Sequence, residues 1–223
     1  MQFRHEVKHE ISHHDMLILR QRLRAVMSPD RHAVNGQYEI RSLYFDNLDD
    51  KALREKLDGV NIREKYRIRL YNNDPSTLHL ERKFKHGGLG YKNTAELTPE
   101  QAQAIVNGDV DWMSRSTNDV ILGFYTRIRT EGLKAKVIVD YTREPFVFAP
   151  GNVRVTLDYG IRTGMSCTDL LNPSCVTVPV PEASCILEVK WDNYLPDVIR
   201  SAIQLDGRHS GAFSKYAASR MYD

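Results

Sequence analysis

Residues 65–71 read Lys65-Tyr66-Arg67-Ile68-Arg69-Leu70-Tyr71. Aromatic and aliphatic residues alternate here with basic ones. Because successive side chains of a β-strand point to opposite faces, Arg67 and Arg69 share one face while Ile68 and Leu70 share the other. The stretch therefore predicts a strand with one apolar face and one strongly basic face.

The same alternation recurs along the chain and predicts seven or eight strands. We expect them over residues 3–11, 38–46, 62–71, 77–85, 134–142, 152–159 and 184–191. Helical patterns separate them, at residues 15–27, 49–57, 116–129, 196–205 and 210–221 and after Thr98, where Thr98-Pro99-Glu100-Gln101 has the form of a capping box. The fold class expected is α+β, an antiparallel β-barrel or tunnel of about eight strands braced by helices.

Charged residues occupy one face of most of these strands, whereas the polar face of an ordinary half-buried strand is mixed. If the apolar faces pack beneath the helices, the charged faces line a central tunnel. The alternative is a twisted sheet whose charged faces meet water and pair across strands. A basic tunnel would suit a polyanion together with a divalent metal. The charged sets are Arg4, Glu6, Lys8 and Glu10; Arg67 and Arg69; His79, Glu81 and Lys83; Arg154 and Asp158; and Glu188 and Lys190.

The composition limits the number of domains, the cellular compartment and the class of partner. The 223 residues, 41% of them hydrophobic, suffice for one domain over residues 1–223. Three cysteines without a CxxC spacing argue for a reducing cytoplasm, and neither a signal peptide nor an apolar run long enough to span a membrane is present. A net charge of +2 and the lack of a stacking platform argue against nucleic acid as a partner.

Glycines interrupt the pattern at residues 85–92, Lys85-His86-Gly87-Gly88-Leu89-Gly90-Tyr91-Lys92. The segment lacks the GxxxxGK[ST] spacing of a phosphate-binding loop that opens a helix. We interpret it as a hairpin loop; a phosphate lid that carries Lys92 inward is the alternative.

Eight motifs, taken in order, resemble the VTC (vacuolar transporter chaperone) domain, the polyphosphate polymerase branch of the CYTH-like triphosphate tunnel metalloenzymes. The resemblance runs from Arg4 to Arg220. Each motif is weak alone, but their order is specific. They are Arg4-His5-Glu6-Val7-Lys8, Ser42-Leu43-Tyr44-Phe45-Asp46-Asn47, Lys65-Tyr66-Arg67-Ile68-Arg69-Leu70-Tyr71, Leu80-Glu81-Arg82-Lys83, Val139-Asp140-Tyr141-Thr142-Arg143, Val153-Arg154-Val155-Thr156-Leu157-Asp158, Ile186-Leu187-Glu188-Val189-Lys190 and Phe213-Ser214-Lys215-Tyr216.

The resemblance implies a tunnel in which ATP and inorganic polyphosphate lie along basic strands. An Mn2+ or Mg2+ ion would bridge phosphates, and the terminal phosphoryl group of ATP would pass to the growing chain. By motif, the phosphate ligands would be Lys8, Arg67, Arg69, Lys83, Arg143 and Arg154, with Arg54, Lys56, Lys92, Lys190 and Lys215 as further phosphate contacts. Glu188 would hold the metal, helped by Glu6 or Glu81.

One departure bears on the reaction. The wider superfamily often begins Glu-x-Glu-x-Lys, and here Arg4 stands in place of the first glutamate. The loss of one carboxylate favours a transferase or a binding role over a hydrolase. A metal-dependent triphosphate or nucleoside triphosphate hydrolase and a non-enzymatic polyphosphate-binding module remain alternatives. Translocation of a product would need a separate membrane protein partner, which would hold the chain at the inner face of a membrane.

Overall fold

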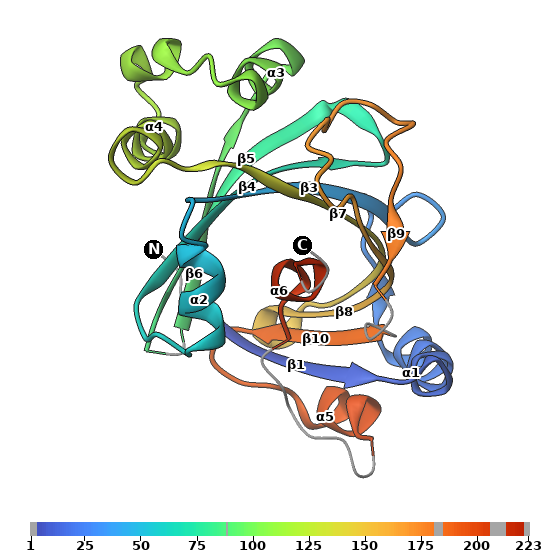
Figure 1. Cartoon of the computed structure of the whole chain (residues 1–223). Coiled ribbons are helices and arrows are strands. Elements are labelled where there is room, and N and C mark those ends of the chain that lie inside the picture. The colour runs from blue at the N-terminus through green and yellow to red at the C-terminus, as the bar shows by residue number, and fades with distance from the viewer. Residues whose placement is uncertain (1–3, 88, 181–184, 206–212, 221–223) are drawn as a thin grey trace.

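An antiparallel sheet curls around a central space in the computed structural model, which describes residues 4–87, 89–180, 185–205 and 213–220 (Figure 1). The strand order is β1-β10-β8-β7-β3-β4-β5-β6, and the short β2 and β9 pair with β7 and β8. An isolated bridge between Arg4, just before β1, and Gly90 of β6 brings the two edges of the curled sheet together, as expected for a barrel. The strands are β1 (His5–Ile11), β2 (Ser28–Pro29), β3 (Tyr38–Asp46), β4 (Arg63–Tyr71), β5 (Asp74–His86), β6 (Leu89–Glu96), β7 (Lys134–Phe148), β8 (Val153–Thr163), β9 (Val178–Pro179) and β10 (Cys185–Trp191).

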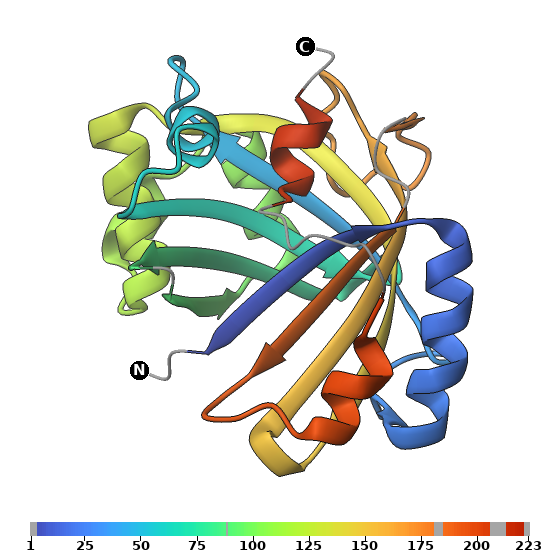
Figure 2. The same cartoon turned by 90° about the horizontal axis from the view of Figure 1, so that it is seen from below.

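Helices cover the outside of this barrel at two places. At one, α1 (His13–Val26) and α5 (Asp197–Ile203) pack side by side on β8 and β10 (Figure 2). At the other, α3 (Pro99–Asn107), the 3-10 turn η1 (Asp111–Arg115) and α4 (Asp119–Glu131) cover β3, β4 and β5. The apolar faces of the strands supply the core beneath both groups, since burying them drives the packing. The charged faces consequently point into the barrel.

The capping box predicted at Thr98 forms, and α1 begins with a second one. Ser12 accepts a hydrogen bond from the backbone N–H of Asp15, whose carboxylate accepts one from the N–H of Ser12. Thr98 and Gln101 make the same reciprocal pair at the start of α3. Each pair satisfies two of the backbone donors that a helix leaves free at its N-terminus.

Two short helices line the inner side of the barrel. The first, α2 (Lys51–Leu57), follows β3 and lies at one mouth. The second, α6 (Lys215–Ser219), lies within the ring of strands (Figure 1). Its Tyr216 is buried and donates a hydrogen bond to Asp46 Oδ2 over 2.7 Å. Arg220, just after α6, forms two hydrogen bonds with the carboxylate of Asp50. These contacts fix α6 to the end of β3 and the start of α2.

The sequence analysis missed one strand of the barrel. Gly87 is in a turn, as expected for the hairpin loop, but β6 already begins at Leu89 and pairs with β5 over its whole length. Asn93 and Thr94 blur its alternation, and two nearby glycines favour a loop interpretation. The strands β7 and β8 also run further than expected, to Phe148 and Thr163. Residues 210–212 and 221 of the predicted last helix lie outside the described residues.

None of the helices in the described part of the chain is long and apolar enough to cross a lipid bilayer.

Candidate functional site

The strands β4 and β5 bring two arginines and a glutamate together inside the barrel. Arg67 Nε donates to Glu81 Oε2 over 2.7 Å, and its Nη1 donates to the hydroxyl of Tyr44 over 2.9 Å. Arg69 donates to Ser42 Oγ over 3.0 Å and to the hydroxyl of Tyr141 over 2.8 Å, and it is only 3% exposed. Both guanidinium groups are therefore held in one orientation before any ligand binds, which is the arrangement that favours phosphate recognition.

The seam between β1, β5 and β10 carries a second charged group. Lys83 Nζ lies 3.0 Å from Glu6, and Lys8 Nζ lies 3.1 Å from Glu6 and 3.7 Å from Glu188. Lys190 forms an ion pair with Glu188 as well. Despite their burial, Glu6 and Glu188 have pKa values held below the usual range by these lysines, to about 2 for Glu6. Both carboxylates are ionised at neutral pH.

A third group joins β7, β8 and α6. Arg143 makes a two-pronged contact with Asp158 over 2.6 and 2.7 Å, and Lys215 Nζ reaches the same carboxylate over 2.5 Å. Arg143 Nη2 also lies 3.4 Å from Glu188, which links this group to the seam. Asp158 is fully buried and the two cations lower its pKa to about 2. One buried carboxylate thus serves two cations.

Four other predicted residues lie near the ends of the barrel. Arg154 pairs with Asp30 over 3.0 Å and its side chain is 37% exposed. Lys92 reaches inward from β6 to Glu81 Oε1 over 2.9 Å. On α2, Lys56 is half-buried and its pKa is lowered by burial and by Arg63 and Lys85, whereas Arg54 is exposed. The structure therefore does not bring Arg54 to the interior groups described above.

Sequence reasoning missed two residues of the interior, Lys65 and Tyr44. Lys65 shares a face with Arg67 and Arg69 through its spacing, and its ammonium lies 5.3 Å from the centre of the Tyr44 ring. Tyr44 shares a face with Ser42 and Asp46 on β3. The two-residue period indicates the position of Lys65, whereas the approach of Tyr44 to Arg67 depends on the pairing of β3 with β4.

The three predicted metal ligands are not brought together. Glu6 and Glu188 share Lys8 as a partner, while Glu81 is engaged by Arg67 and Lys92. Among the residues that the structure describes, no three His, Cys, Asp or Glu side chains form a group that could hold a metal ion by themselves. Mg2+ and Mn2+ in phosphoryl-transfer sites commonly take one or two carboxylates and fill the remaining positions with phosphate oxygens and water. Glu6 and Glu188 fit that requirement.

Burial and neighbouring cations lower the pKa of Lys83 to about 7. A bound phosphate chain favours the protonated ammonium, so binding needs proton uptake once the pH exceeds that pKa. We expect affinity for tripolyphosphate, measured by calorimetry without metal, to fall above about pH 7 by up to about tenfold per unit for each such group.

The matched variant is Lys83→Arg, which stays charged throughout this range. Its affinity should fall less steeply with pH than that of the wild type, and ionisation of the ligand itself affects both proteins equally. Identical slopes for the two proteins would contradict a role for Lys83 in this pH dependence.

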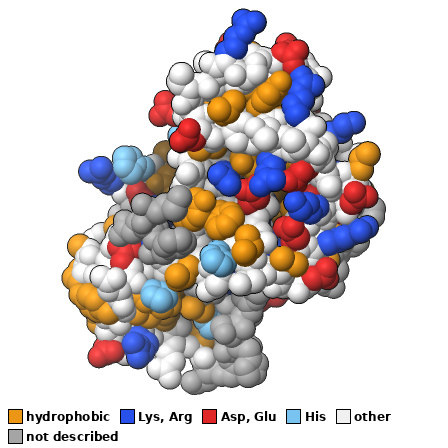
Figure 3. Space-filling model, turned by 90° about the vertical axis from the view of Figure 1, so that its left-hand side faces the viewer, with side chains coloured by type: hydrophobic (Ala, Val, Ile, Leu, Met, Phe, Trp, Pro, Cys, Tyr) orange, Lys and Arg blue, Asp and Glu red, His pale blue; other side chains and the backbone are white. Residues whose placement is uncertain are grey.

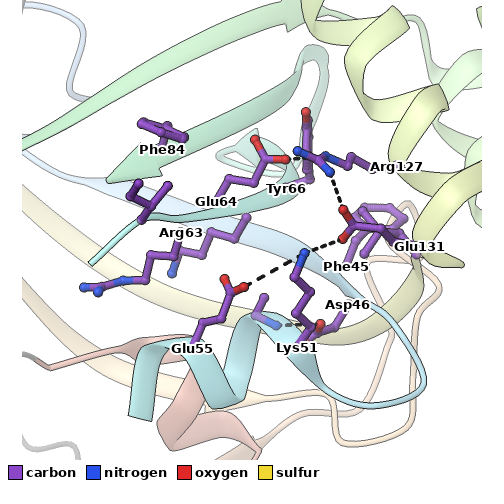
Figure 4. A pocket seen from close by; sticks show the side chains of 14 residues that line it. Phe45, Asp46, Lys51, Glu55, Arg63, Glu64, Tyr66, Phe84, Arg127 and Glu131 are labelled. Atoms are coloured by element: carbon purple, nitrogen blue, oxygen red, sulfur yellow. Dashed lines mark hydrogen bonds and ion pairs between the residues drawn. The ribbon is translucent and has the colours of Figure 1, made fainter. Parts of the chain in front are cut away.

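A cavity of about 160 Å3 lies between α2, α4 and β4, and its lining includes Lys65 (Figure 4). Two ion pairs flank it: Lys51 with Glu131 over 2.9 Å, and Arg127 with Glu64 over 2.5 Å. Figure 3 shows positive and negative side chains interspersed on this side of the molecule. Unlike the interior, this surface has no preponderance of cations for an anion to use.

Comparisons with known proteins agree with this geometry. The model of the VTC domain family matches residues 3–222. The structure resembles a Hippeastrum protein described as a proposed adenylyl cyclase with dominant triphosphatase activity, at 13% identity and a TM-score of 0.53 over 99% of this chain and 95% of that one. It also resembles a proposed adenylate cyclase from Bacillus halodurans, at 13% identity and a TM-score of 0.50 over 85% and 80%.

A search of curated protein sequences gives no match. The structural likenesses establish the triphosphate tunnel fold, and the family match covers nearly the whole sequence. With its closed antiparallel barrel and its inward-facing arginines and lysines, the chain belongs to the VTC domain family.

Proposed function

We propose that this protein is an ATP-dependent polyphosphate polymerase, which transfers the γ-phosphoryl group of ATP to the end of a polyphosphate chain inside the tunnel. The observation that carries the proposal is the excess of cations over carboxylates on the inner face. The four interior carboxylates that pair with them are Glu6, Glu81, Asp158 and Glu188. The interior cations are Lys8, Lys65, Arg67, Arg69, Lys83, Arg143, Lys190 and Lys215, with Lys92, Arg154 and Lys56 nearer the ends.

Such a row of cations suits a chain of phosphates better than a single phosphate group. Phosphoryl transfer asks a protein mainly to position the reacting groups and to stabilise charge on the phosphate oxygens. Arg67, Arg69 and Arg143 would clamp successive phosphates, because each is already oriented by fixed partners. Lys8, Lys83 and Lys190 would contribute more mobile charges at the seam, and Lys215 would contact phosphate from α6.

A divalent metal, Mg2+ or Mn2+, would neutralise charge on the phosphates when bound. Glu188 would hold it with Glu6 as the second carboxylate, because both contact Lys8, whereas the cations that engage Glu81 are different ones. We expect Glu188→Gln to reduce polyphosphate synthesis by about two orders of magnitude at a fixed metal concentration, because it removes the central carboxylate.

The measurement is the synthesis rate as a function of Mg2+ or Mn2+ concentration. The matched control is Glu10→Gln, which changes an exposed glutamate on β1. An unchanged metal requirement in Glu188→Gln would contradict the assignment.

Hydrolysis of triphosphate or nucleoside triphosphate is the second candidate, favoured by the triphosphatase activity described for the Hippeastrum protein with this fold. The position of Arg4 supports the polymerase instead. Arg4 lies just before β1, and its Nε is 2.8 Å from Asp192. Position 4 therefore offers no carboxylate beside Glu6. A binding module without turnover is the third candidate.

The test is incubation with ATP labelled on the γ-phosphate and Mg2+ or Mn2+, followed by a gel that separates polyphosphate from free phosphate. A ladder of labelled chains is the expected result. Label in free phosphate would instead identify a hydrolase, and label that remains in ATP in the presence of polyphosphate primer would leave a binding module.

We further propose that residues 1–223 act as one tunnel domain, a view supported by the family match over residues 3–222. ATP and polyphosphate would be its ligands, and a membrane protein would be needed only if the product crosses a membrane.

A further inference from the structure

Tyr44 lies at the centre of the basic interior. It is 3% exposed, and its hydroxyl accepts a hydrogen bond from Arg67 Nη1 over 2.9 Å. The ammonium of Lys65 lies 5.3 Å and the guanidinium carbon of Arg67 lies 5.7 Å from the centre of its ring. The ring also stacks on that of Tyr216 with centroids 5.1 Å apart. Tyr44 is therefore a buried phenol in contact with two cations and a second aromatic ring.

The charges around Tyr44 are strongly unbalanced. On β4 the facing groups are Lys65, Arg67 and Arg69, all cationic when protonated. The nearest acids already have partners, since Glu81 on β5 binds Arg67 and Asp46 on β3 accepts the hydroxyl of Tyr216 on α6. On β7 the facing titratable group is Tyr141, whose hydroxyl accepts from Arg69. An added negative charge at Tyr44 would face three cations.

This environment acts on the acidity of the phenol. Burial alone raises the pKa of a tyrosine, but Arg67, Lys65 and Arg69 outweigh burial here and lower the pKa of Tyr44 to about 7. The pKa of Arg67 is raised well above its usual value, so this neighbour keeps its charge. Lys65, whose pKa falls to about 8, is the neighbour most easily discharged.

We propose that Tyr44 carries a negative charge while no phosphate chain is in the tunnel, and that it takes up a proton from solvent when a phosphate chain binds. The inference rests on the proposed binding of polyphosphate in the tunnel. Before binding, the phenolate holds Arg67 and Lys65 toward the tunnel axis and reduces their mutual repulsion. Bound phosphate then supplies the negative charge, and the phenolate becomes a neutral phenol. Tyr44 is thus a positioning residue that acts through Arg67 and Lys65.

Tyrosinate absorbs at longer ultraviolet wavelengths than tyrosine, so the proton uptake is directly visible. At about pH 8, about nine-tenths of a group with a pKa of about 7 is ionised. Adding inorganic tripolyphosphate to the metal-free protein at this pH should remove close to one tyrosinate per chain from the difference spectrum. Lysines that gain protons on binding contribute nothing to this band.

Two tyrosine variants assign the signal. Tyr44→Phe should abolish it, and Tyr194→Phe, which changes a tyrosine 56% exposed on the surface, should keep it. Tyr71 is the necessary comparison, because Arg69 also lowers its pKa. Loss of the signal in Tyr71→Phe with retention in Tyr44→Phe would overturn the proposal.

Calorimetry on the same samples separates this inference from the proposed function. If tripolyphosphate does not bind the wild type, the proposed function fails. If it binds without loss of tyrosinate, only the role of Tyr44 fails. As a functional readout, Tyr44→Phe should weaken the dependence of KM for ATP on pH between about 6 and 9, while a purely structural role would lower activity equally at every pH.

Discussion

Replacing Arg69 by alanine is expected to reduce polyphosphate synthesis from ATP by about 10²- to 10³-fold, the loss typical of removing one preorganised contact to developing charge. The guanidinium is 3% exposed and is fixed by Ser42 and by Tyr141. The rate of label transfer from γ-labelled ATP into chains is the measurement.

Two further variants make the result specific to the geometry. Arg69→Lys keeps the charge but not the planar fork, so its rate should lie between those of the wild type and the alanine variant. Arg200→Ala removes an arginine whose side chain is 68% exposed on α5 and should leave the rate unchanged. Full synthesis by a folded Arg69→Ala protein, as judged by its thermal unfolding, would refute the assignment.

The largest expected effect on stability comes from Asp158→Asn. This carboxylate is fully buried and is the shared partner of Arg143 and Lys215. Its removal leaves two cations with little compensation, and breaking a buried ion pair in this way costs about 3–5 kcal/mol. The free energy of unfolding, measured by urea titration near neutral pH, should fall by that amount.

The Asp158→Asn variant has an excess of positive charge, and the response to an added anion tests whether this excess causes the loss of stability. Tripolyphosphate should stabilise Asp158→Asn more than it stabilises the wild type, since the bound anion replaces the missing negative charge. Asp197→Asn, a change at an exposed aspartate on α5, serves as the control and should be neutral within about 0.5 kcal/mol. Loss of stability that tripolyphosphate does not restore to a greater extent than in the wild type would indicate a purely steric defect.

The barrel could be predicted from the sequence because each strand has one apolar face that must be buried. In Arg67-Ile68-Arg69-Leu70 charged and apolar residues alternate with a period of two. This alternation predicts that the apolar side chains point outward and the charged ones inward. The inward position of Glu6, Lys8, Glu188 and Lys190 follows from the same rule. The capping residues Ser12 and Thr98 were equally readable, because the hydrogen bonds that they make are local.

What the sequence could not give was the pairing of charges across the barrel. Lys215 and Asp158 lie 57 residues apart, and Tyr44 and Arg67 lie 23 apart, so neither contact follows from a local pattern. Arg154 illustrates the limit, since its strand face was predicted correctly but its partner is Asp30, which comes from a loop after β2. The choice of partner depends on how distant strands register, and a one-residue slip would alter every pair.

The pairing of the first strand of the chain with the last has a kinetic consequence. Strands β1 and β10 pair residue by residue from His5 with Trp191 to Ile11 with Cys185, although almost the whole sequence lies between them. Bringing such distant segments together costs chain entropy before the stabilising contacts have formed. This cost slows folding. A phosphate chain bound as proposed would contact only the folded tunnel, so it would not speed folding. The loaded protein should therefore unfold more slowly while refolding at the same rate as the unloaded one.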